Sequence, residues 1–432
     1  MMKLFLFLGA VTAGTAFATP FPASDPENKG DWTLLESVSD EFEGDSLDSA
    51  KWLNLGLDDN YHGEWKGRAP SQYNPANISV SDGHLTIRSR WQPDFKFSDS
   101  TLHGTAYGTP APVTTGAVLS TTRFKYGYLE MRCQAADGPV SSSFWTTGNG
   151  GEIDVFEHFG ENSGNPESAY RYHTSLHDWR KGSPTFSKRI WQNDHRLAFK
   201  VAADFHVYGL DWTPDRLSVY IDGRLIRTVS RQELGKQWIA TDEQKIWIDS
   251  ETFDWEMNPN QLKETDFAQN PEFVVDYCRV WQHRAPGYDP ELPPNLFGNQ
   301  GFEEGLKSWV GEGEITQDAY LGESAAKLTR SGKIQQTVEV QPNTTYVLSA
   351  WAKLPATNRK DAWTDSWLNV ASYGGPRLSV KFFMPDYHRK SLEFTTGPDA
   401  KNATIWITNA PKSHPTFVDH FELRESTPRL KK

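Results

Sequence analysis

The stretch Glu152-Ile153-Asp154-Val155-Phe156-Glu157 interleaves three carboxylates with apolar residues and points most directly to the fold. Valine, isoleucine and phenylalanine favour a pleated strand, and the run Gly148-Asn149-Gly150-Gly151 before it is typical of a hairpin turn. Because side chains alternate along a strand, Glu152 and Asp154 lie on one face and the apolar residues on the other. The stretch therefore predicts one strand of an antiparallel β-sheet.

The third carboxylate reaches this face only if the strand is irregular. In a regular strand Glu157, five positions after Glu152, points to the opposite face. One extra residue absorbed near Val155-Phe156 returns it to the face of the other two, and such β-bulges are over-represented beside active sites. Carboxylates on one face suggest a glycosidase in which one attacks the sugar and another donates the proton. The bare pattern also fits an exposed acidic strand or a short amphipathic helix.

Short alternating runs separated by turn residues dominate the chain from residue 31 to residue 283. Many strands at hairpin spacing predict an all-β, antiparallel sandwich. Short helical turns are expected only at Thr241–Lys245 and around Pro259–Phe267. The strand-like runs include Asn77–Arg88, Phe124–Cys133, Val140–Trp145, Arg216–Ile226 and Phe273–Trp281.

Composition divides the chain into four parts. Residues 1–18 read as a secretory signal peptide, because Lys3 is followed by the apolar run Leu4–Val11 and by the small-residue cleavage pattern Ala16-Phe17-Ala18. Residues 25–284 form the first strand-rich domain, and residues 285–294 form a proline-rich linker. Residues 295–426 form a second strand-rich region, which we predict to be another β-sandwich module.

The leader and the charge limit the cellular role. The apolar run of the leader is too short to cross a bilayer, so we expect a soluble, secreted protein, either extracellular or periplasmic. The formal net charge of −12 argues against nucleic acid and anionic membranes as partners. The 17 tryptophans and 15 tyrosines exceed what a core requires, and sugars stack on flat aromatic faces.

The chain has two cysteines, Cys133 and Cys278, both in strand-like segments. The sequence leaves open whether they form a disulfide, and two buried free thiols fit equally well. No metal-ligand spacing involves them.

Aromatic and histidine side chains flank the acidic strand. Trp145 ends a strand that we expect to pair with it, as a stacking wall beside Glu152 or as a core residue. His173 and His177 share a strand face and would hydrogen-bond sugar hydroxyls. They would also suit a metal, but no third ligand at a suitable spacing supports one, so we predict no metal site.

The segment Trp65–Tyr73 is a glycine- and proline-punctuated loop with an aromatic residue and two cations. Binding groups gather on such loops. Arg68 offers a planar fork for a sulfate or for paired hydroxyls, with Trp65 and Lys66 beside it. An exposed loop with solvated charges explains the segment equally well.

Several motifs together, in this order, resemble glycoside hydrolase family 16 over most of residues 31–283. The family has a jelly-roll β-sandwich fold with a concave substrate face, which agrees with the strand pattern. The motifs are Ser39-Asp40-Glu41-Phe42, Lys51-Trp52, Val80–Ile87, Tyr126–Arg132, the acidic strand, Phe205–Asp215 and Val274–Val280.

This resemblance implies Glu152 as nucleophile, Glu157 as general acid/base and Asp154 as the carboxylate that orients and tunes the nucleophile. The loop at residues 65–70 and the strands before and after the acidic strand look like those of agarases and porphyranases. The resemblance therefore implies an endo-acting enzyme that cleaves β-1,4-galactosidic bonds of red-algal galactans with retention. The chain departs from agarases at Glu157-His158-Phe159-Gly160, where they more often carry a small residue after the acid. Furcellaran, carrageenan and laminarin remain alternative substrates.

The region from Asn295 resembles carbohydrate-binding modules of the family 4 and 9 type. The likeness lies in Asn299–Gly305, Trp309, Gln336–Val338, Tyr346–Trp351 and Val418–Leu423. Its candidate stacking residues are Trp363, Trp367 and Tyr373, which also fit a core.

The expected partner is a polysaccharide bound by a monomer, with no cofactor for catalysis. A structural calcium ion is compatible with the resemblance, and Glu43 and Asp276 are candidate ligands. A non-catalytic galactan-binding protein competes with the hydrolase, but binding alone needs no trio of acids. A transglycosylase would use the same intermediate.

Overall fold

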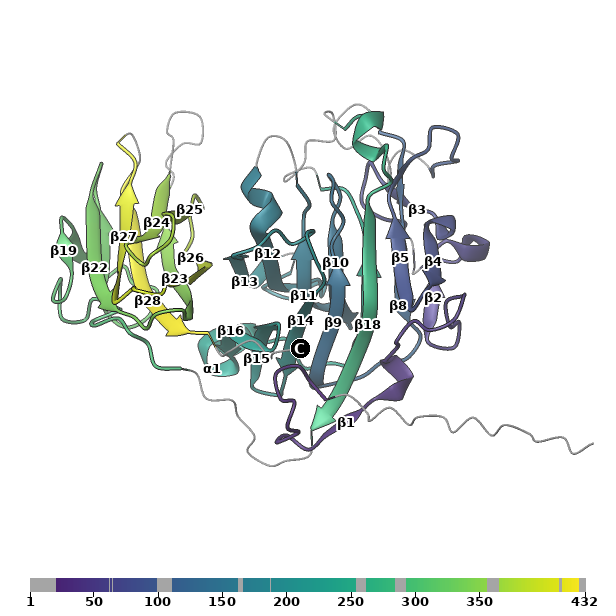
Figure 1. The fold of residues 1–432 in the computed structure, drawn as a ribbon, viewed down its shortest axis with the longest axis horizontal. Helices are drawn as coiled ribbons and strands as arrows, with labels where there is room; N and C mark the ends of the chain where they lie inside the picture. Colours follow the sequence, from purple (N-terminus) through teal and green to yellow (C-terminus); the bar gives the residue numbers. More distant parts are fainter. Residues whose placement is uncertain are drawn as a thin grey trace, which may run out of the picture.

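The computed structural model consists of two β-sandwiches side by side, the first from the N-terminal part of the chain and the second from the C-terminal part (Figure 1). The described residues are 21–61, 63, 65–98, 111–161, 166–186, 188–253, 262–283, 293–355, 365–411 and 414–426. The predicted signal peptide and nearly all of the predicted linker lie outside them. No helix among the described residues is long and apolar enough to cross a membrane.

The first sandwich has two antiparallel layers of strands, as the sequence predicted. One layer has the order β16-β15-β14-β9-β18-β5-β4, with β1 also paired to β18. Its strands are β16 (Arg224–Ser230), β15 (Arg216–Ile221), β14 (His206–Trp212), β9 (Gly127–Gln134), β18 (Glu272–His283), β5 (His84–Arg88), β4 (Ile78–Ser81) and β1 (Trp32–Leu34).

The second layer has the order β2-β8-β17-β10-β11-β12-β13. Inward-facing apolar residues of both layers, such as Phe156 and Tyr208, pack into one large core. The strands of this layer are β2 (Trp52–Asn54), β8 (Ala117–Ser120), β17 (Lys245–Asp249), β10 (Ser142–Gly148), β11 (Gly151–His158), β12 (Arg171–Asp178) and β13 (Lys188–Arg196). A small sheet of β3 (Gln72–Tyr73), β7 (Val113–Thr115) and β6 (Arg90–Trp91) lies beside them.

Helix is scarce within the described residues, as expected. Of the two helical turns predicted from the sequence, the first is wrong. Thr241–Lys245 is a turn that leads into β17, because Gln244 forms a bridge with Phe124. The 3-10 turn η7 (Glu264–Phe267) falls in the second expected region, whose start lies outside the described residues. The other helical segments are α1 (Arg231–Leu234), η1 (Glu36–Val38), η2 (Leu57–Asp59), η3 (Pro75–Asn77), η4 (Pro166–Tyr170) and η5 (Gly235–Gln237).

The C-terminal module is a second sandwich with its own apolar core. One layer contains β26 (His388–Thr395), β23 (Thr345–Lys353), β28 (Thr416–Glu425), β21 (Ala325–Leu328) and β20 (Glu314–Thr316). The other contains β19 (Val310–Gly311), β22 (Lys333–Glu339), β27 (Asn402–Asn409), β24 (Ser366–Ala371) and β25 (Leu378–Phe382).

The two sandwiches share one continuous sheet. Edge strand β13 pairs in parallel with β26 of the module, with Asp194 opposite Lys390 and His195 opposite Ser391. This pairing covers two strand edges that would otherwise expose unpaired backbone groups. The module is therefore joined to the first domain through its backbone.

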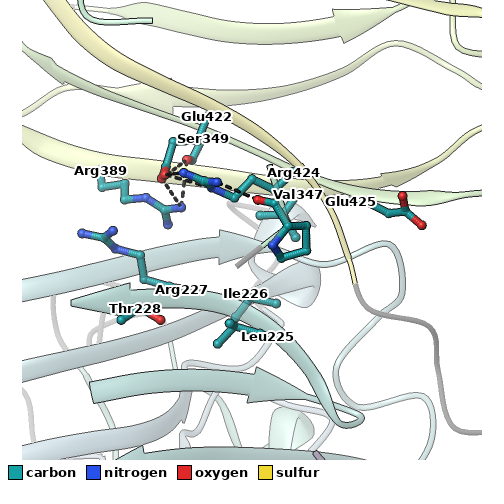
Figure 2. A pocket seen from close by; sticks show the side chains of 11 residues that line it. Leu225, Ile226, Arg227, Thr228, Val347, Ser349, Arg389, Glu422, Arg424 and Glu425 are labelled. Carbon is teal, nitrogen blue, oxygen red and sulfur yellow. Dashed lines mark hydrogen bonds and ion pairs between the residues drawn. The ribbon is translucent and has the colours of Figure 1, made fainter. Parts of the chain in front are cut away.

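A buried ion pair and further hydrogen bonds reinforce this junction. Arg224 of β16 approaches Glu393 of β26 at 2.8 Å, and both side chains are 2% exposed. Arg389 of the module binds Asn193 of β13, and Tyr320 donates a hydrogen bond to Glu233 at 2.8 Å. Figure 2 shows Arg389 and Glu422 of the module facing Arg227 of β16 across a small cavity.

Cys133 and Cys278 are both buried and free. They lie on adjacent strands β9 and β18, but Cys133 is opposite Val275 and Cys278 is opposite Met131. The structure thus settles the open alternative in favour of two thiols.

Candidate active site

Strand β11 contains the bulge predicted from the spacing of the acids. Its register with β12 shifts between Asp154, which is opposite Ser175, and Glu157, which is opposite His173. Two residues of β11, Val155 and Phe156, thus face the single residue between those partners, which is the definition of a bulge. Glu157 consequently joins Asp154 on one face, which we call the carboxylate face.

Hydroxyl groups of β12 bind backbone carbonyl oxygens at the bulge. The Tyr172 hydroxyl donates to the carbonyl oxygen of Val155 at 2.7 Å, and the Thr174 hydroxyl donates to that of Asp154. Since buried carbonyl groups without a partner are costly, these two hydroxyls stabilise the irregular strand. Neither residue was singled out from the sequence.

Glu152 lies at the accessible start of the carboxylate face. Trp179, just after β12, donates its indole N–H to Glu152 Oε2 at 2.9 Å. The Trp179 ring stacks on His177 with a centroid distance of 5.4 Å and is 43% exposed. Trp179 was missed in the sequence because only its position after the histidine strand marks it.

Asp154 lies between the other carboxylates and is held by β12. The Ser175 hydroxyl donates to Asp154 Oδ2, and His177 Nε2 lies 3.3 Å from the same oxygen. One ligand atom each from Glu152, Asp154 and His177 lies within 4.8 Å of the others. This cluster contains only one of the two predicted histidines, and Ser175 and Trp179 already hydrogen-bond its two carboxylates.

Glu157 lies between residues of the two neighbouring strands, β12 and β10. Its Oε2 lies 3.8 Å from Nε2 of His173, and Ser143 of β10 is its register partner on the other side. Phe159 packs near His173 with a centroid distance of 5.8 Å. Both predicted histidines therefore reach the carboxylate face, each beside a different acid.

Burial and mutual repulsion raise the pKa values of the two glutamates on this face. Burial first, and the Asp154 charge second, raise the pKa of both Glu152 and Glu157 well above the usual range. The Trp179 hydrogen bond favours the charged form of Glu152 and opposes the rise in its pKa. Glu157 has no such bond among the causes of its shift, so the environment favours ionisation of Glu152 and protonation of Glu157.

The Trp65–Tyr73 loop folds onto the same site. Arg68 Nε lies 3.2 Å from Glu251 Oε2, and the guanidinium lies over the ring of Phe253 at 4.6 Å. The Arg68 charge acts on both Glu152 and Glu157 and lowers the pKa of each. Trp65 is 39% exposed, and its indole N–H donates to the Tyr73 hydroxyl at 3.4 Å.

A second acidic group, missed in the sequence, extends the face toward β17. The Tyr73 hydroxyl is 2.7 Å from Glu251 and 3.0 Å from Asp249, and burial raises the pKa of Asp249 well above its usual range. The predicted Trp145 donates to Asp249 at 3.2 Å and stacks on Trp247 at 4.8 Å. Trp145 is opposite Asp154 in the sheet, so it borders the carboxylates. Asp249 lacked a local signal because only long-range pairing brings β17 here.

The opposite side of the face contains polar residues of β13. Gln192 is opposite Ser175, and exposed Arg189 is opposite His177. Arg189 donates to Gln192, and its charge lowers the pKa of Glu157. The sequence did not single out either residue.

The calcium candidates lie elsewhere. Asp276 forms an ion pair with Arg132 on the neighbouring strand, and Glu43 is exposed near Gly83. Among the described residues, no clustered set of three metal-ligating side chains contains either of them. Calcium remains a prediction.

The three candidate stacking residues of the module do not share one surface in the structure. Trp367 lies on the outer face of the β22–β27–β24–β25 layer, where Asn369 and Trp406 are register partners and Lys381 lies over its ring at 5.8 Å. Tyr373 is 2% exposed and packs in the core. Trp363 lies outside the described residues.

Comparisons with known proteins find a matching family for each of the two sandwiches. The β-porphyranase A–D, GH16 domain family matches residues 32–283, and a carbohydrate-binding domain family matches residues 294–413. A β-porphyranase B of Zobellia galactanivorans is 27% identical over 291 residues, covering 60% of this chain and 88% of the relative. A β-agarase of Phocaeicola plebeius is 28% identical, covering 59% and 87%. A keratan-sulfate endo-1,4-β-galactosidase of Sphingobacterium multivorum is 26% identical, covering 90% and 86%.

Proposed function

Because the chain belongs to the β-porphyranase A–D family of GH16 glycoside hydrolase domains, we propose that it is a retaining endo-hydrolase of β-1,4-galactosidic bonds in red-algal galactans. The observation that carries the proposal is the bulged strand β11, which brings Asp154 and Glu157 to one face. The hydrogen bond from Trp179 to Glu152 supports different protonation states for the two glutamates. The names of the three relatives support a galactan and, in one case, the β-1,4 linkage.

In the proposed mechanism, Glu152 attacks the anomeric carbon while Glu157 gives its proton to the departing glycosidic oxygen. The bond from the anomeric carbon to that oxygen breaks, and a glycosyl ester to Glu152 forms. Glu157, now ionised, removes a proton from water, whose oxygen attacks the same carbon and releases Glu152. Asp154 keeps the pKa of Glu157 high before the first step and, with Ser175, orients the region beside Glu152.

The remaining predicted site residues would bind the sugar chain. Trp65 and Trp145 offer aromatic faces at the border of the carboxylates, and His173 and His177 offer ring N–H groups. Arg68 lies close enough for its charge to act on both glutamates, and its guanidinium contacts Glu251 and Phe253. With exposed Arg189 on the other side, the site suits a substrate with hydroxyl groups or sulfate esters.

Digestion of agarose, porphyran, carrageenans and laminarin side by side, with analysis of released reducing ends and products, tests the proposal. We expect release from agarose or porphyran, and the preferred one decides whether the cations bind sulfate. Release from carrageenan or laminarin alone would change the proposed substrate but leave the proposed chemistry in place. Binding without release from any of them would favour the non-catalytic alternative.

We further propose that the protein is secreted and acts as a monomer without a catalytic cofactor. The leader-like residues 1–18 and the net charge of −12 support secretion. Size-exclusion chromatography with light scattering tests the oligomeric state, and fractionation of the producing cells tests the location. A calcium requirement would appear as a lower melting temperature in chelator.

A further inference from the structure

We infer that the edge of the C-terminal module at Phe383 and Met384 supplies an outer sugar-binding position for the polysaccharide held on the carboxylate face. This inference rests on the proposed hydrolase function. It assigns the module a direct part in binding the chain that is being cut, in addition to its role as a separate carbohydrate-binding domain. The argument depends on two rows of side chains that run across the shared sheet.

The first row begins at Asp154 and ends at the module. Asp154 is opposite Ser175, and Ser175 is opposite Gln192. Directly opposed residues of antiparallel strands point to the same side, so Gln192 lies on the carboxylate face. The Gln192 amide donates to the Met384 sulfur at 3.6 Å, which brings the module to the end of this row.

The second row begins at Glu157 and ends at an exposed aromatic ring. Glu157 is opposite His173, which is opposite Asp194. Asp194 forms an ion pair with Lys390 of the module, and the two residues are also register partners. The Lys390 ammonium lies 5.2 Å from the ring centroid of Phe383, whose side chain is 46% exposed.

The span is suited to a sugar chain. Adjacent strands lie about 4.8 Å apart, so three steps from β11 to β26 cover roughly 14 Å, a span within reach of a short oligosaccharide. An oligosaccharide that runs across the strands therefore passes Gln192 and exposed Arg189 before it reaches Phe383. The exposed ring offers an apolar face to a galactosyl unit, and the nearby cations accommodate a neutral or a sulfated one.

The junction fixes this position relative to the carboxylates. The pairing of β13 with β26 and the buried contact between Arg224 and Glu393 join the two sandwiches. The Arg389 and Glu422 side chains line a small cavity at the junction (Figure 2). A preformed position avoids the ordering cost that a tethered domain would incur on binding. Phe383 is thus built into the same surface as the catalytic groups.

The test is the effect of Phe383→Ala on kcat/KM in the full chain, measured with a ladder of galactan oligosaccharides. We expect the loss to grow with substrate length and to reach about threefold to tenfold for the longest, the size of one aromatic stacking contact. Phe383→Leu, which keeps the apolar bulk without the ring, should show the same length dependence. Ile315→Ala, a change at an exposed apolar residue of β20 at the far edge of the module layer that contains β26, should show none.

An equal loss at every length, or no loss, would overturn the inference, provided that the variants melt like the parent protein. Failure of the proposed function would differ, because the parent protein would then hydrolyse no galactan oligosaccharide of any length.

Discussion

Two of the regions that contain buried carboxylates, the carboxylate face and the junction with the module, differ in their surroundings. On the carboxylate face, Glu152 and Glu157 lie near a third acid, and burial and that neighbour raise their pKa values. At the junction with the module, Glu393 pairs with Arg224. Burial there would raise the pKa of Glu422, but neighbouring arginines lower it to about 2.

The difference separates charge that stabilises a fold from charge that serves a reaction. A buried charge costs several kcal/mol unless it is paired, so natural folds pair theirs, as the junction does. Crowded acids on an accessible face make no such contribution to folding. Their raised pKa values instead suit a proton donor that must stay protonated near neutral pH.

Loss of the nucleophile should have the largest effect. Glu152→Gln should lower kcat for galactan hydrolysis by a factor on the order of 10⁴ or more, since a group essential to the chemistry is lost. Its melting temperature should stay equal or rise, because one repelling acid is gone. Initial-rate assays and thermal melts measure both, and near-normal turnover would remove Glu152 from its role.

Breaking a pair at the junction should instead reduce stability. Arg224→Met leaves Glu393 buried without its cation and should lower the free energy of unfolding by about 3–5 kcal/mol. Replacing both residues by methionine should recover most of that loss, since no charge is then left unpaired. Denaturant unfolding of the single and double variants gives both values. A double variant no better than the single one would show that the pair is not the source of the effect.

The pH profile should respond to Asp154. Glu157 works as an acid while protonated, so activity falls as the pH rises through its pKa. The Asp154 charge raises that pKa, and Asp154→Asn should therefore move the alkaline limb of kcat/KM to lower pH. Asp242→Asn, a change at an acid outside the carboxylate face, is the matched control and should leave the limb in place. A shift to higher pH would contradict the electrostatic assignment.

A smaller effect is expected from Glu422 at low pH. Its pKa in the folded protein is about 2, below the usual 4.5, so its contribution to stability is complete above about pH 4.5. That contribution is lost as the pH falls toward 2. The difference in melting temperature between the parent protein and Glu422→Gln should therefore shrink over this range. A difference that does not change with pH would show that pairing of the Glu422 charge is unimportant.

The bulge and the junction show what the sequence predicts and what it cannot. The bulge followed from a local rule, the alternation of side chains applied to the spacing of Glu152 and Glu157. The match of β13 to β26 joins residues such as Asp194 and Lys390, far apart in the chain, and no local pattern encodes that pairing. Asp249 reaches the site in the same long-range way, through β10 and β17.

The expected helical turn at Thr241–Lys245 failed for a related reason. Its polar residues suit a turn or a helix start, but the bridge of Gln244 to Phe124 draws the segment into a strand. The predicted histidines, by contrast, share one face of β12 because their spacing preserves the alternation of the strand.

The anomeric configuration of the first product tests the central claim most directly. NMR spectroscopy of galactan hydrolysis at early times, before mutarotation, distinguishes the two anomers. Double displacement by Glu152 and Glu157 predicts that the β-anomer appears first, which requires carboxyl groups about 5 Å apart. An initial α-anomer would mean that water attacks directly, and it would contradict the roles proposed for both glutamates.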